Sequence, residues 1–396
     1  MAQRLYTPYG FRDILFDESW QQTEIRHRLR KVFRAFGYRD VETPLVEYLE
    51  VFSDERGSIP TQDMYKFVDR DGELLALRPD MTPALARMAS FYYRDEDLPL
   101  RVTSSGPTFR YSSRYSAKQR QLKQTGIELY GTADPLMDAE VVATSIQALQ
   151  ASGVSEFRTA IGHADLVQGL LKAFDLSEEE IQEWSRQIES KNTFALEQEA
   201  REKGLSEEQT AMLLLLTESG DVDLLRRGKE LAEKLRLKQM LDAFEWLLET
   251  DRLLGLYHVA EYVLYDPGMK PELNYYTGII FKGYALGAAE PVLDGGRYDA
   301  LLRQMGAEWG AVGSAIYQDC LLEALKHQDL LPEPFVCTLL TGPDPELLIR
   351  RAETMRAEGK AVVCVPGLSA DEARVYAEKH CDSRVLIITE EGQETV

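Results

Sequence analysis

Apolar positions recur at helical spacing near the start of the chain and over a long stretch in its middle. Residues 17–36 predict an amphipathic helix that ends at Gly37, because one face carries Ile25, Leu29, Val32, Phe33 and Phe36. From about residue 166 to residue 261 the chain is rich in Leu, Glu, Lys and Gln and poor in Pro and β-branched residues. This stretch predicts several short helices, which are divided at Gly204, Gly220 and Gly228.

Shorter apolar runs on both sides of this helical stretch predict strands. Segments 64–68 and 74–78 flank Asp71-Gly72, which is a strong signal for a hairpin with a two-residue turn. Two further strands are expected around a polar loop between Gly106 and Glu128. Other predicted strands are 38–43, 263–264, 275–282 and 290–293, and other predicted helices are 82–93, 136–152, 298–305 (after a turn at Gly295-Gly296) and 314–326.

The last part of the chain has a different pattern. Pro332-Glu333-Pro334 is typical of a linker, and beyond it strands at 335–340, 361–365 and 384–389 alternate with helices at 345–358 and 370–379. Strands that alternate with helices favour parallel pairing. The pattern therefore predicts a core at residues 1–325 with a helical insertion at about 166–262, and a small α/β domain at 332–396.

The charge of the chain limits its partners. With 66 acidic and 45 basic residues among 396, the net charge is −21, and such a surface repels a long phosphate backbone. Segment 98–127 departs from this balance, because it contains no Asp or Glu and holds six basic residues: Arg101, Arg110, Arg114, Lys118, Arg120 and Lys123. This basic segment fits an anion the size of a nucleotide or a carboxylate better than a duplex.

Several other classes are disfavoured. The first twenty residues lack the pattern of a signal peptide, and no apolar run approaches the roughly 18 residues that cross a bilayer. The four cysteines are widely spaced and only five histidines are present, which disfavours a metal site. We expect a cytoplasmic protein without membrane attachment, metal or cofactor.

Five short motifs carry the functional signal, although each alone is typical of an ordinary strand or turn. Together and in this order they resemble the catalytic core of histidyl-tRNA synthetase, a class II enzyme, over about residues 1–325. The resemblance implies an α+β fold with an antiparallel sheet flanked by helices. The motifs are Tyr9-Gly-Phe-Arg-Asp13, Leu77-Arg-Pro-Asp-Met-Thr82, Phe109-Arg110, Leu273-Asn-Tyr-Tyr-Thr277 and Gly295-Gly-Arg-Tyr-Asp299.

Two segments resemble class II motifs of known role. Residues 17–44 resemble motif 1, which builds the dimer interface, so the resemblance implies a dimer formed through this region. Residues 106–131 resemble motif 2, whose arginine holds the α-phosphate of ATP, and Arg110 occupies that position.

Three departures from the synthetase pattern concern the chemistry. Ser112 replaces the glutamate that meets the adenine, Cys320 replaces the arginine that ends motif 3 (Gly-Leu-Glu-Arg), and Pro271 replaces the arginine of the histidine-specific motif. Glu272 follows where that motif has glycine. Losing one aimed charge costs about 10²–10³ in rate. Because neither cysteine nor proline supplies a cation, the chain is expected to have no catalytic residues.

The residues that match the amino-acid pocket are better preserved. By resemblance, a histidine-binding pocket is expected from Asp80 (a glutamate in the synthetase), Thr82, Arg110, Gln124, Glu128 and Tyr276. Tyr275 is also assigned to this pocket, although the sequence leaves open whether it lines the pocket or faces the core.

A synthetase-like core that keeps the pocket and loses the chemistry resembles the regulatory subunit of ATP phosphoribosyltransferase. The resemblance implies a hetero-octamer with the short-form catalytic subunit, which the chain would activate in the first step of histidine biosynthesis, with histidine as feedback effector. Residues 330–396 hold 12 acids and 7 bases, so tRNA binding is not expected. A divergent active histidyl-tRNA synthetase and another synthetase-like accessory protein remain alternatives.

Overall fold

The computed structural model describes residues 5–52, 59–94, 98–111, 119–174, 176–271, 275–380, 384–389 and 392–395. Two compact units divide the chain. The larger unit comprises Met1–Arg12 and Ile25–Leu331, and the smaller unit comprises Asp13–Glu24 and Pro332–Val396. The boundary falls within the first helix, α1 (Phe16–Ala35).

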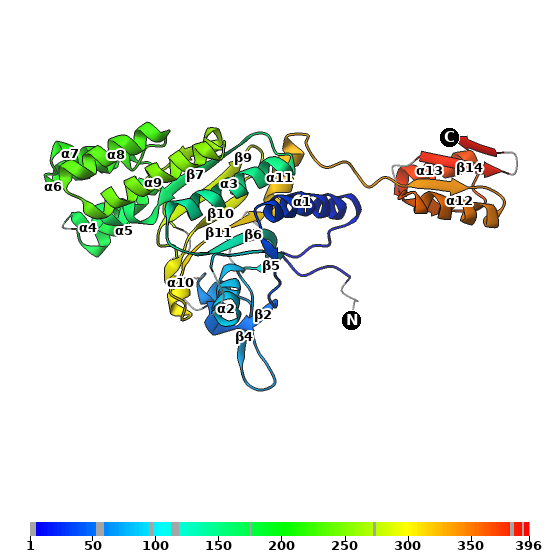
Figure 1. Ribbon diagram of the computed structural model, residues 1–396, viewed down its shortest axis with the longest axis horizontal. Helices are drawn as coiled ribbons and strands as arrows, with labels where there is room; N and C mark the ends of the chain where they lie inside the picture. The colour runs from blue at the N-terminus through cyan, green and yellow to red at the C-terminus, as the bar shows by residue number, and fades with distance from the viewer. Residues whose placement is uncertain are drawn as a thin grey trace. The chain divides into compact units, whose positions relative to one another are not determined.

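An eight-stranded sheet forms the centre of the larger unit within the described residues (Figure 1). The pairs β1–β5 and β7–β8 are parallel and the other neighbours are antiparallel. This confirms the predicted α+β class with an antiparallel sheet. The order is β1 (Arg39–Asp40), β5 (Leu100–Phe109), β6 (Gln121–Gly131), β11 (Gly310–Tyr317), β10 (Leu293–Arg297), β9 (Ile279–Ala285), β7 (Phe157–His163) and β8 (Val263–Tyr265).

Each face of this sheet is covered by its own layer. Alternate residues of β6 separate the layers, because Ile127 and Leu129 pack with α1 and α3 (Pro135–Ser152), whereas Tyr130 packs on the opposite side. The second layer contains α2 (Thr82–Tyr92), α10 (Asp299–Gln304) and a small sheet of β2 (Val46–Tyr48), β4 (Leu74–Leu77) and β3 (Lys66–Val68), together with the short helices η1 (Leu49–Phe52) and η3 (Thr61–Asp63).

Helix α3 has a complete set of end signals. The side chain of Asp134 accepts a hydrogen bond from the Met137 amide at 3.0 Å, and Pro135 occupies the first turn. Gly153 ends the helix at φ +107°, a conformation that glycine adopts without strain. The predicted helix 136–152 is thereby confirmed within one residue.

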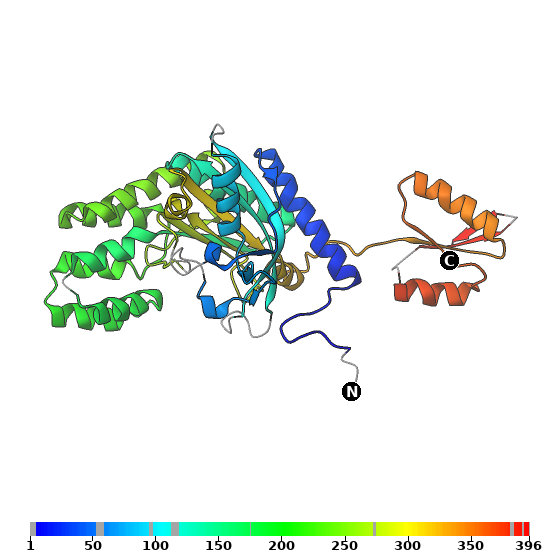
Figure 2. The ribbon, with the colours of Figure 1, turned by 90° about the horizontal axis from the view of Figure 1, so that it is seen from below.

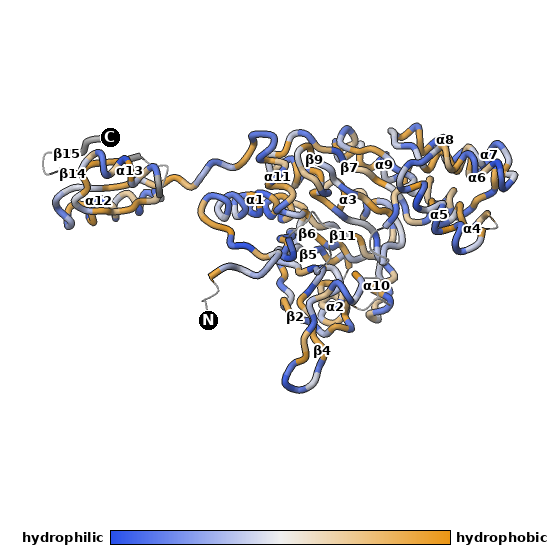
Figure 3. The backbone as a smooth tube through the Cα atoms, turned by 180° about the vertical axis from the view of Figure 1, so that it is seen from behind, coloured by the Kyte–Doolittle hydropathy of each residue, from blue (hydrophilic) through white to orange (hydrophobic). Residues whose placement is uncertain are grey.

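A helical stretch separates β7 from β8. It consists of α4 (Ala164–Ala173), α5 (Glu178–Glu189), α6 (Thr193–Lys203), α7 (Glu207–Leu215), α8 (Val222–Leu235) and α9 (Lys238–Leu256), with η4 (Ala260–Tyr262) after it. Ser177 and Ser206 begin α5 and α7 with capping boxes. The helices gather beside the β7 end of the sheet (Figure 2) and alternate hydrophilic and hydrophobic positions (Figure 3), which is typical of amphipathic packing. Of the described helices, none combines the length and apolar character that a membrane crossing requires.

The smaller unit contains its own sheet, in the order β13 (Val362–Cys364), β12 (Thr338–Thr341), β14 (Arg384–Thr389) and β15 (Gly392–Thr395). The first three strands pair in parallel, as predicted, and α12 (Pro345–Ala357) and α13 (Ala370–His380) accompany them. Strand β15 pairs antiparallel with β14 and was not predicted.

Two predictions around the glycine-rich segments are wrong. Gly295-Gly296 lies inside β10 and not in a turn, and residues 314–317 belong to β11, so helix α11 (Gln318–His327) begins later than predicted. The physical reason is close packing, since a Cβ on Gly295 would stand 2.4 Å from the Phe281 ring and one on Gly296 2.7 Å from the Tyr276 ring.

Other boundaries also differ. Strand β7 was not predicted, β9 begins at Ile279 instead of residue 275, and the strand predicted at 38–43 is reduced to β1. Strands β3 and β4 pair antiparallel as predicted, but residues 69–73 connect them instead of a two-residue turn. The Asp69 carboxylate accepts hydrogen bonds from the Asp71 and Glu73 amides, which stabilises this longer loop.

Candidate functional site

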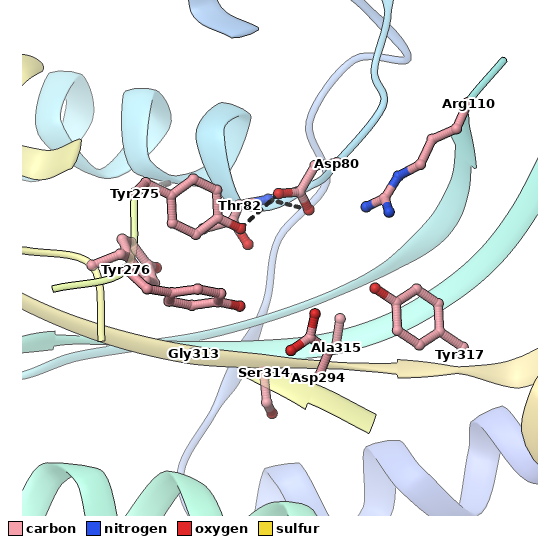
Figure 4. A pocket seen from close by; sticks show the side chains of 11 residues that line it. Asp80, Thr82, Arg110, Tyr275, Tyr276, Asp294, Gly313, Ser314, Ala315 and Tyr317 are labelled. Carbon is pink, nitrogen blue, oxygen red and sulfur yellow. Dashed lines mark hydrogen bonds between the residues drawn. The ribbon is translucent and has the colours of Figure 1, made fainter. Parts of the chain in front are cut away.

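A pocket lies on the α2 and α10 face of the large sheet (Figure 4). It holds about 310 Å³ of space, part of which is open to solvent. Its walls come from the turn before α2, the end of β5, the segment before β9, and strands β10 and β11. The lining residues are Asp80, Thr82, Arg110, Tyr275, Tyr276, Asp294, Tyr298, Gly313, Ser314, Ala315 and Tyr317.

Glu128 of β6 forms the base of this site. Its side chain is buried, and the Thr82 hydroxyl donates to its Oε1 at 2.8 Å. The Tyr298 hydroxyl donates to its Oε2. Thr82 begins α2 and Tyr298 immediately precedes α10, so two helix starts converge on one carboxyl group.

The environment of Glu128 changes its ionisation. Burial raises the pKa of Glu128 to about 8, and the neighbouring Asp80 carboxylate raises it further, although hydrogen bonds from Tyr298 and Thr82 act in the opposite direction. At neutral pH Glu128 is therefore mostly protonated. A cationic group placed beside it would favour the carboxylate form.

Asp80 and the two tyrosines form the opposite wall. The Tyr275 hydroxyl donates to Asp80 Oδ2 at 2.8 Å, and the Thr82 amide donates to Asp80 Oδ1 at 3.4 Å. The Tyr275 ring packs edge-on against Tyr276 and Tyr298, with centroids 4.9 and 5.7 Å apart. Tyr275 thus lines the pocket and also belongs to the core.

Among the lining residues that the structure describes, Arg110 is the cation, and Figure 4 shows its guanidinium directed into the pocket. Its Nε donates to the Pro79 carbonyl at 2.8 Å. The turn that carries Pro79 is itself fixed by buried Arg78, which donates to the carbonyls of Pro107 at 2.9 Å and Thr43 at 3.0 Å. Arg78 is a positioning residue that sequence analysis did not single out.

Gln124 lies on the same face of β6 as Glu128, two strand repeats away, and is not among the lining residues. Its side chain is 1% exposed, and neither its Nε2 nor its Oε1 has a hydrogen-bond partner among the described residues. A buried amide in this state is poised to bind a polar group that reaches it.

The structure thus brings together the residues that sequence analysis predicted. Glu128 contacts the pocket through Thr82 and Tyr298. The predicted residues that line the pocket directly are Asp80, Thr82, Arg110, Tyr275 and Tyr276. Sequence analysis did not assign to the pocket Asp294, Tyr298, Gly313, Ser314, Ala315 and Tyr317. Part of β10 was predicted as a turn and part of β11 as a helix, so no strand alternation could be assigned there.

The positions that depart from the synthetase pattern carry no cation. Burial raises the pKa of the Cys320 thiol to about 12, so this side chain is neutral. Pro271 is half-buried. Ser112, Arg114, Lys118 and Glu272 lie outside the described residues. Among the residues that are described, no cluster of three His, Cys, Asp or Glu side chains could hold a metal ion.

A buried ion pair lies next to the pocket. Arg297, which precedes Tyr298, donates from Nη2 to Asp138 Oδ1 of α3 at 2.7 Å and from Nη1 to Asp299 at 3.1 Å. Arg297 is 3% and Asp138 0% exposed. Trp246 of α9 donates to Asp138 Oδ2 at 2.7 Å, so this carboxylate joins the sheet to the helical stretch.

Gly313→Ala is expected to displace Glu128 and to lower the free energy of unfolding by roughly 1–3 kcal/mol. A Cβ at this position would stand 1.6 Å from Glu128 Oε2 and 2.8 Å from the Ile127 carbonyl. Denaturant unfolding would measure the loss. Gly255→Ala is the matched control, because nothing lies within 4 Å of its Cβ position in α9 and the change should stabilise by about 0.5–1 kcal/mol. Equal effects of both substitutions would contradict the expected clash.

Comparison with known proteins places this geometry in a family. The family model for histidyl-tRNA synthetase matches residues 10–321. The chain is 36% identical to the ATP phosphoribosyltransferase regulatory subunit of Acetivibrio thermocellus, with 94% of this chain and 90% of the relative covered. It is 35% identical to the protein of the same name from Caldanaerobacter subterraneus, with 96% of each covered.

Solved structures agree with this assignment. A crystal structure from Bacillus halodurans, described as an ATP phosphoribosyltransferase regulatory subunit/histidyl-tRNA synthetase, is similar with a TM-score of 0.84 at 28% identity, with 98% of this chain and 100% of that chain covered. Histidyl-tRNA synthetase from Nostoc sp. shares the fold, with a TM-score of 0.82 at 21% identity and with 100% of this chain and 97% of that chain covered. The class II synthetase-like fold is thereby confirmed. The chain belongs to the family of ATP phosphoribosyltransferase regulatory subunits, whose core is built like histidyl-tRNA synthetase.

Proposed function

We propose that this chain is a non-catalytic subunit that activates the short-form catalytic subunit of ATP phosphoribosyltransferase in the first step of histidine biosynthesis, and that it binds histidine as the feedback effector. The regulatory-subunit names of its relatives support the partnership. The observation that carries the proposal is the pocket around Glu128, which keeps polar groups for an amino acid while Pro271 and Cys320 supply no cation.

The pocket offers a partner for each polar group of histidine. Glu128 and Tyr298 suit the imidazole, Asp80 suits the α-ammonium group, and Arg110 suits the carboxylate. The unpartnered amide of Gln124 adds a donor and an acceptor on the same face. Thr82 then orients Glu128, and Tyr275 orients Asp80, through the hydrogen bonds described above.

The assembly follows from the same assignment. The chain dimerises through the region of residues 17–44 and joins catalytic subunits in a hetero-octamer in the cytoplasm. The unit at 332–396 is a shortened relative of an anticodon-binding domain, and its excess of acidic residues supports a role without tRNA. Coupling between the histidine pocket and the partner's active site is expected to amount to about 1–3 kcal/mol and to be reciprocal.

Reconstitution tests this function directly. Mixed with the purified short-form catalytic subunit, the chain is expected to raise phosphoribosyltransferase activity, and added histidine should lower it again. The formation of phosphoribosyl-ATP, followed by absorbance, measures both effects. The catalytic subunit alone is the control, and an absence of activation would refute the regulatory assignment.

The rival function, an active histidyl-tRNA synthetase, needs a separate assay. Retention of Arg110 is the feature that favours it. ATP–pyrophosphate exchange that depends on histidine would establish the rival, whereas exchange no higher than without the chain supports the regulatory proposal.

A further inference from the structure

Tyr317 stands at the end of β11 on the pocket side of the sheet. Side chains of a strand alternate between faces, and Gly313, Ala315 and Tyr317 line the pocket, whereas the hydroxyl of Ser314, which also borders it, bonds to Ser145 of α3 on the other face. Tyr317 pairs with Gln124 across the β6–β11 ladder, four residues along β11 from Gly313, which adjoins Glu128. Figure 4 shows its ring on the same side of the pocket as Arg110.

We propose that Tyr317 closes the nucleotide side of this pocket, so that the site admits a free amino acid and excludes a nucleoside triphosphate or an aminoacyl-adenylate. The inference rests on the proposed function only in treating the pocket as an amino-acid site. The proposal assigns the exclusion of nucleotides to the bulk of the Tyr317 ring and not to its hydroxyl group.

The size of the pocket supports this assignment. Pockets for ligands of drug size hold about 300–1,000 Å³. The space of about 310 Å³ here includes open solvent, and the cavity volume that compares with this range is only about 20 Å³, so the pocket as it stands has no room for a nucleotide. An amino acid bound between Glu128 and Arg110 would place its carboxylate near Arg110. A nucleotide attached to that carboxylate would extend toward the Tyr317 ring.

The charges of the residues that line the pocket also favour an amino acid over a nucleotide. Asp80 and Asp294 contribute two carboxyl groups, and Arg110 contributes the one cation among the lining residues that the structure describes. The next acidic group along the chain, Asp319, accepts from the Lys123 amide at 3.0 Å and lies 4.0 Å from Arg12. A triphosphate needs several cationic or amide donors, and among the residues that the structure describes this lining offers one cation.

The sequence around Tyr317 departs from the synthetase pattern at two positions. The stretch that matches the Gly-Leu-Glu-Arg end of motif 3 is Tyr317-Gln318-Asp319-Cys320. Relative to that pattern, Cys320 lacks the cation, and Tyr317 places a ring where the pattern has glycine. The two changes are separable, because one alters charge on α11 and the other fills space on β11.

The test uses the full chain and isothermal titration with MgATP and with adenosine. Tyr317→Gly is expected to bind adenosine or MgATP at least about tenfold more tightly than the unaltered chain, a gain of roughly 1.4 kcal/mol. Tyr317→Phe, which keeps the ring, should show no gain. Adding Arg110→Ala to Tyr317→Gly should abolish any gain in MgATP binding, which locates the nucleotide in this pocket.

Several outcomes would overturn the proposal. These are a folded Tyr317→Gly chain without a gain, an equal gain in Tyr317→Phe, or MgATP binding to the unaltered chain that Arg110→Ala removes. Thermal unfolding establishes folding, and Tyr317→Ala serves if the glycine variant is unstable, since it also removes the ring. Titration of the unaltered chain with histidine is a separate experiment. If histidine does not bind, the proposed function is contradicted, whereas the titrations with MgATP and adenosine test only the role of Tyr317.

Discussion

Arg297→Met is expected to lower the free energy of unfolding by about 3–5 kcal/mol. The substitution leaves the Asp138 carboxylate, which is fully buried, with the Trp246 donor but without its cationic partner. Removing one member of a buried ion pair is costly because the remaining charge must be neutralised or exposed to water. Denaturant unfolding at neutral pH measures the loss.

Two controls identify the cause of this loss. Arg226→Met breaks the exposed ion pair with Asp223 within α8 and should cost no more than about 0.5 kcal/mol. Asp138→Asn, combined with Arg297→Met, removes the uncompensated charge and keeps an acceptor for Trp246, so it should recover part of the stability. If Arg297→Met costs no more than Arg226→Met, the buried pair does not stabilise the fold.

Glu128→Gln is expected to weaken histidine binding by about 1.5–3 kcal/mol, roughly 10–150-fold, while activation of the catalytic subunit persists. The amide oxygen can still accept from one of the two hydroxyl groups, and the amide nitrogen can donate to the other, so the pocket keeps its shape. The amide cannot, however, pair with a cation as a carboxylate does. Titration calorimetry with histidine measures affinity, and the reconstituted complex measures activation. Unchanged affinity would place the effector elsewhere.

The pH dependence separates this explanation from a general defect. A free imidazole is neutral above its usual pKa of about 6.5. Below about pH 8 the pocket carboxyl holds a proton. Between these limits the carboxyl can pass its proton to the imidazole, so histidine affinity should be nearly constant. Above pH 8 histidine binding must take up a proton, so the affinity should fall as pH rises. The Glu128→Gln variant should not show this fall in affinity above pH 8.

The same ionisation affects stability in a predictable direction. The ordinary pKa of a glutamate is 4.5, and burial raises that of Glu128 to about 8 in the folded chain. Between these values the folded chain holds a proton that the unfolded chain has released, so the free energy of unfolding falls as pH rises. Glu128→Gln removes this contribution and should be more stable than the unaltered chain at pH 8.

Sequence patterns were sufficient where an element carries its own signals. Helix α3 has an Asp cap, an early proline and a terminal glycine, and its predicted bounds were right within one residue. The seven residues assigned to the pocket were named because their motifs resemble a known family. Five of them line the pocket, Glu128 contacts it through Thr82 and Tyr298, and Gln124 is not among the lining residues. Their binding role remains a prediction.

Sequence patterns predicted the wrong element where a glycine is required for close packing inside a strand and not for a turn. Gly295 and Gly313 lie in the interiors of strands because a ring or a carboxyl group occupies the space of their missing side chains. Such contacts join residues far apart in the chain, so local spacing carries no trace of them. Because part of β10 was predicted as a turn and part of β11 as a helix, neither Asp294 nor Tyr317 could be placed on the pocket face.

The hydrogen bond from Trp246 to Asp138 also restricts how this protein can be rebuilt. Helix α9 supplies a donor to the carboxylate that holds Arg297, beside the tyrosine that contacts Glu128. A chimera that exchanges the helical stretch for one from a relative must therefore bring an indole or another N–H donor to position 246. The helical stretch is therefore not structurally independent of the core. Exchanging it without this donor would disturb Arg297 and the neighbouring Tyr298 at the pocket.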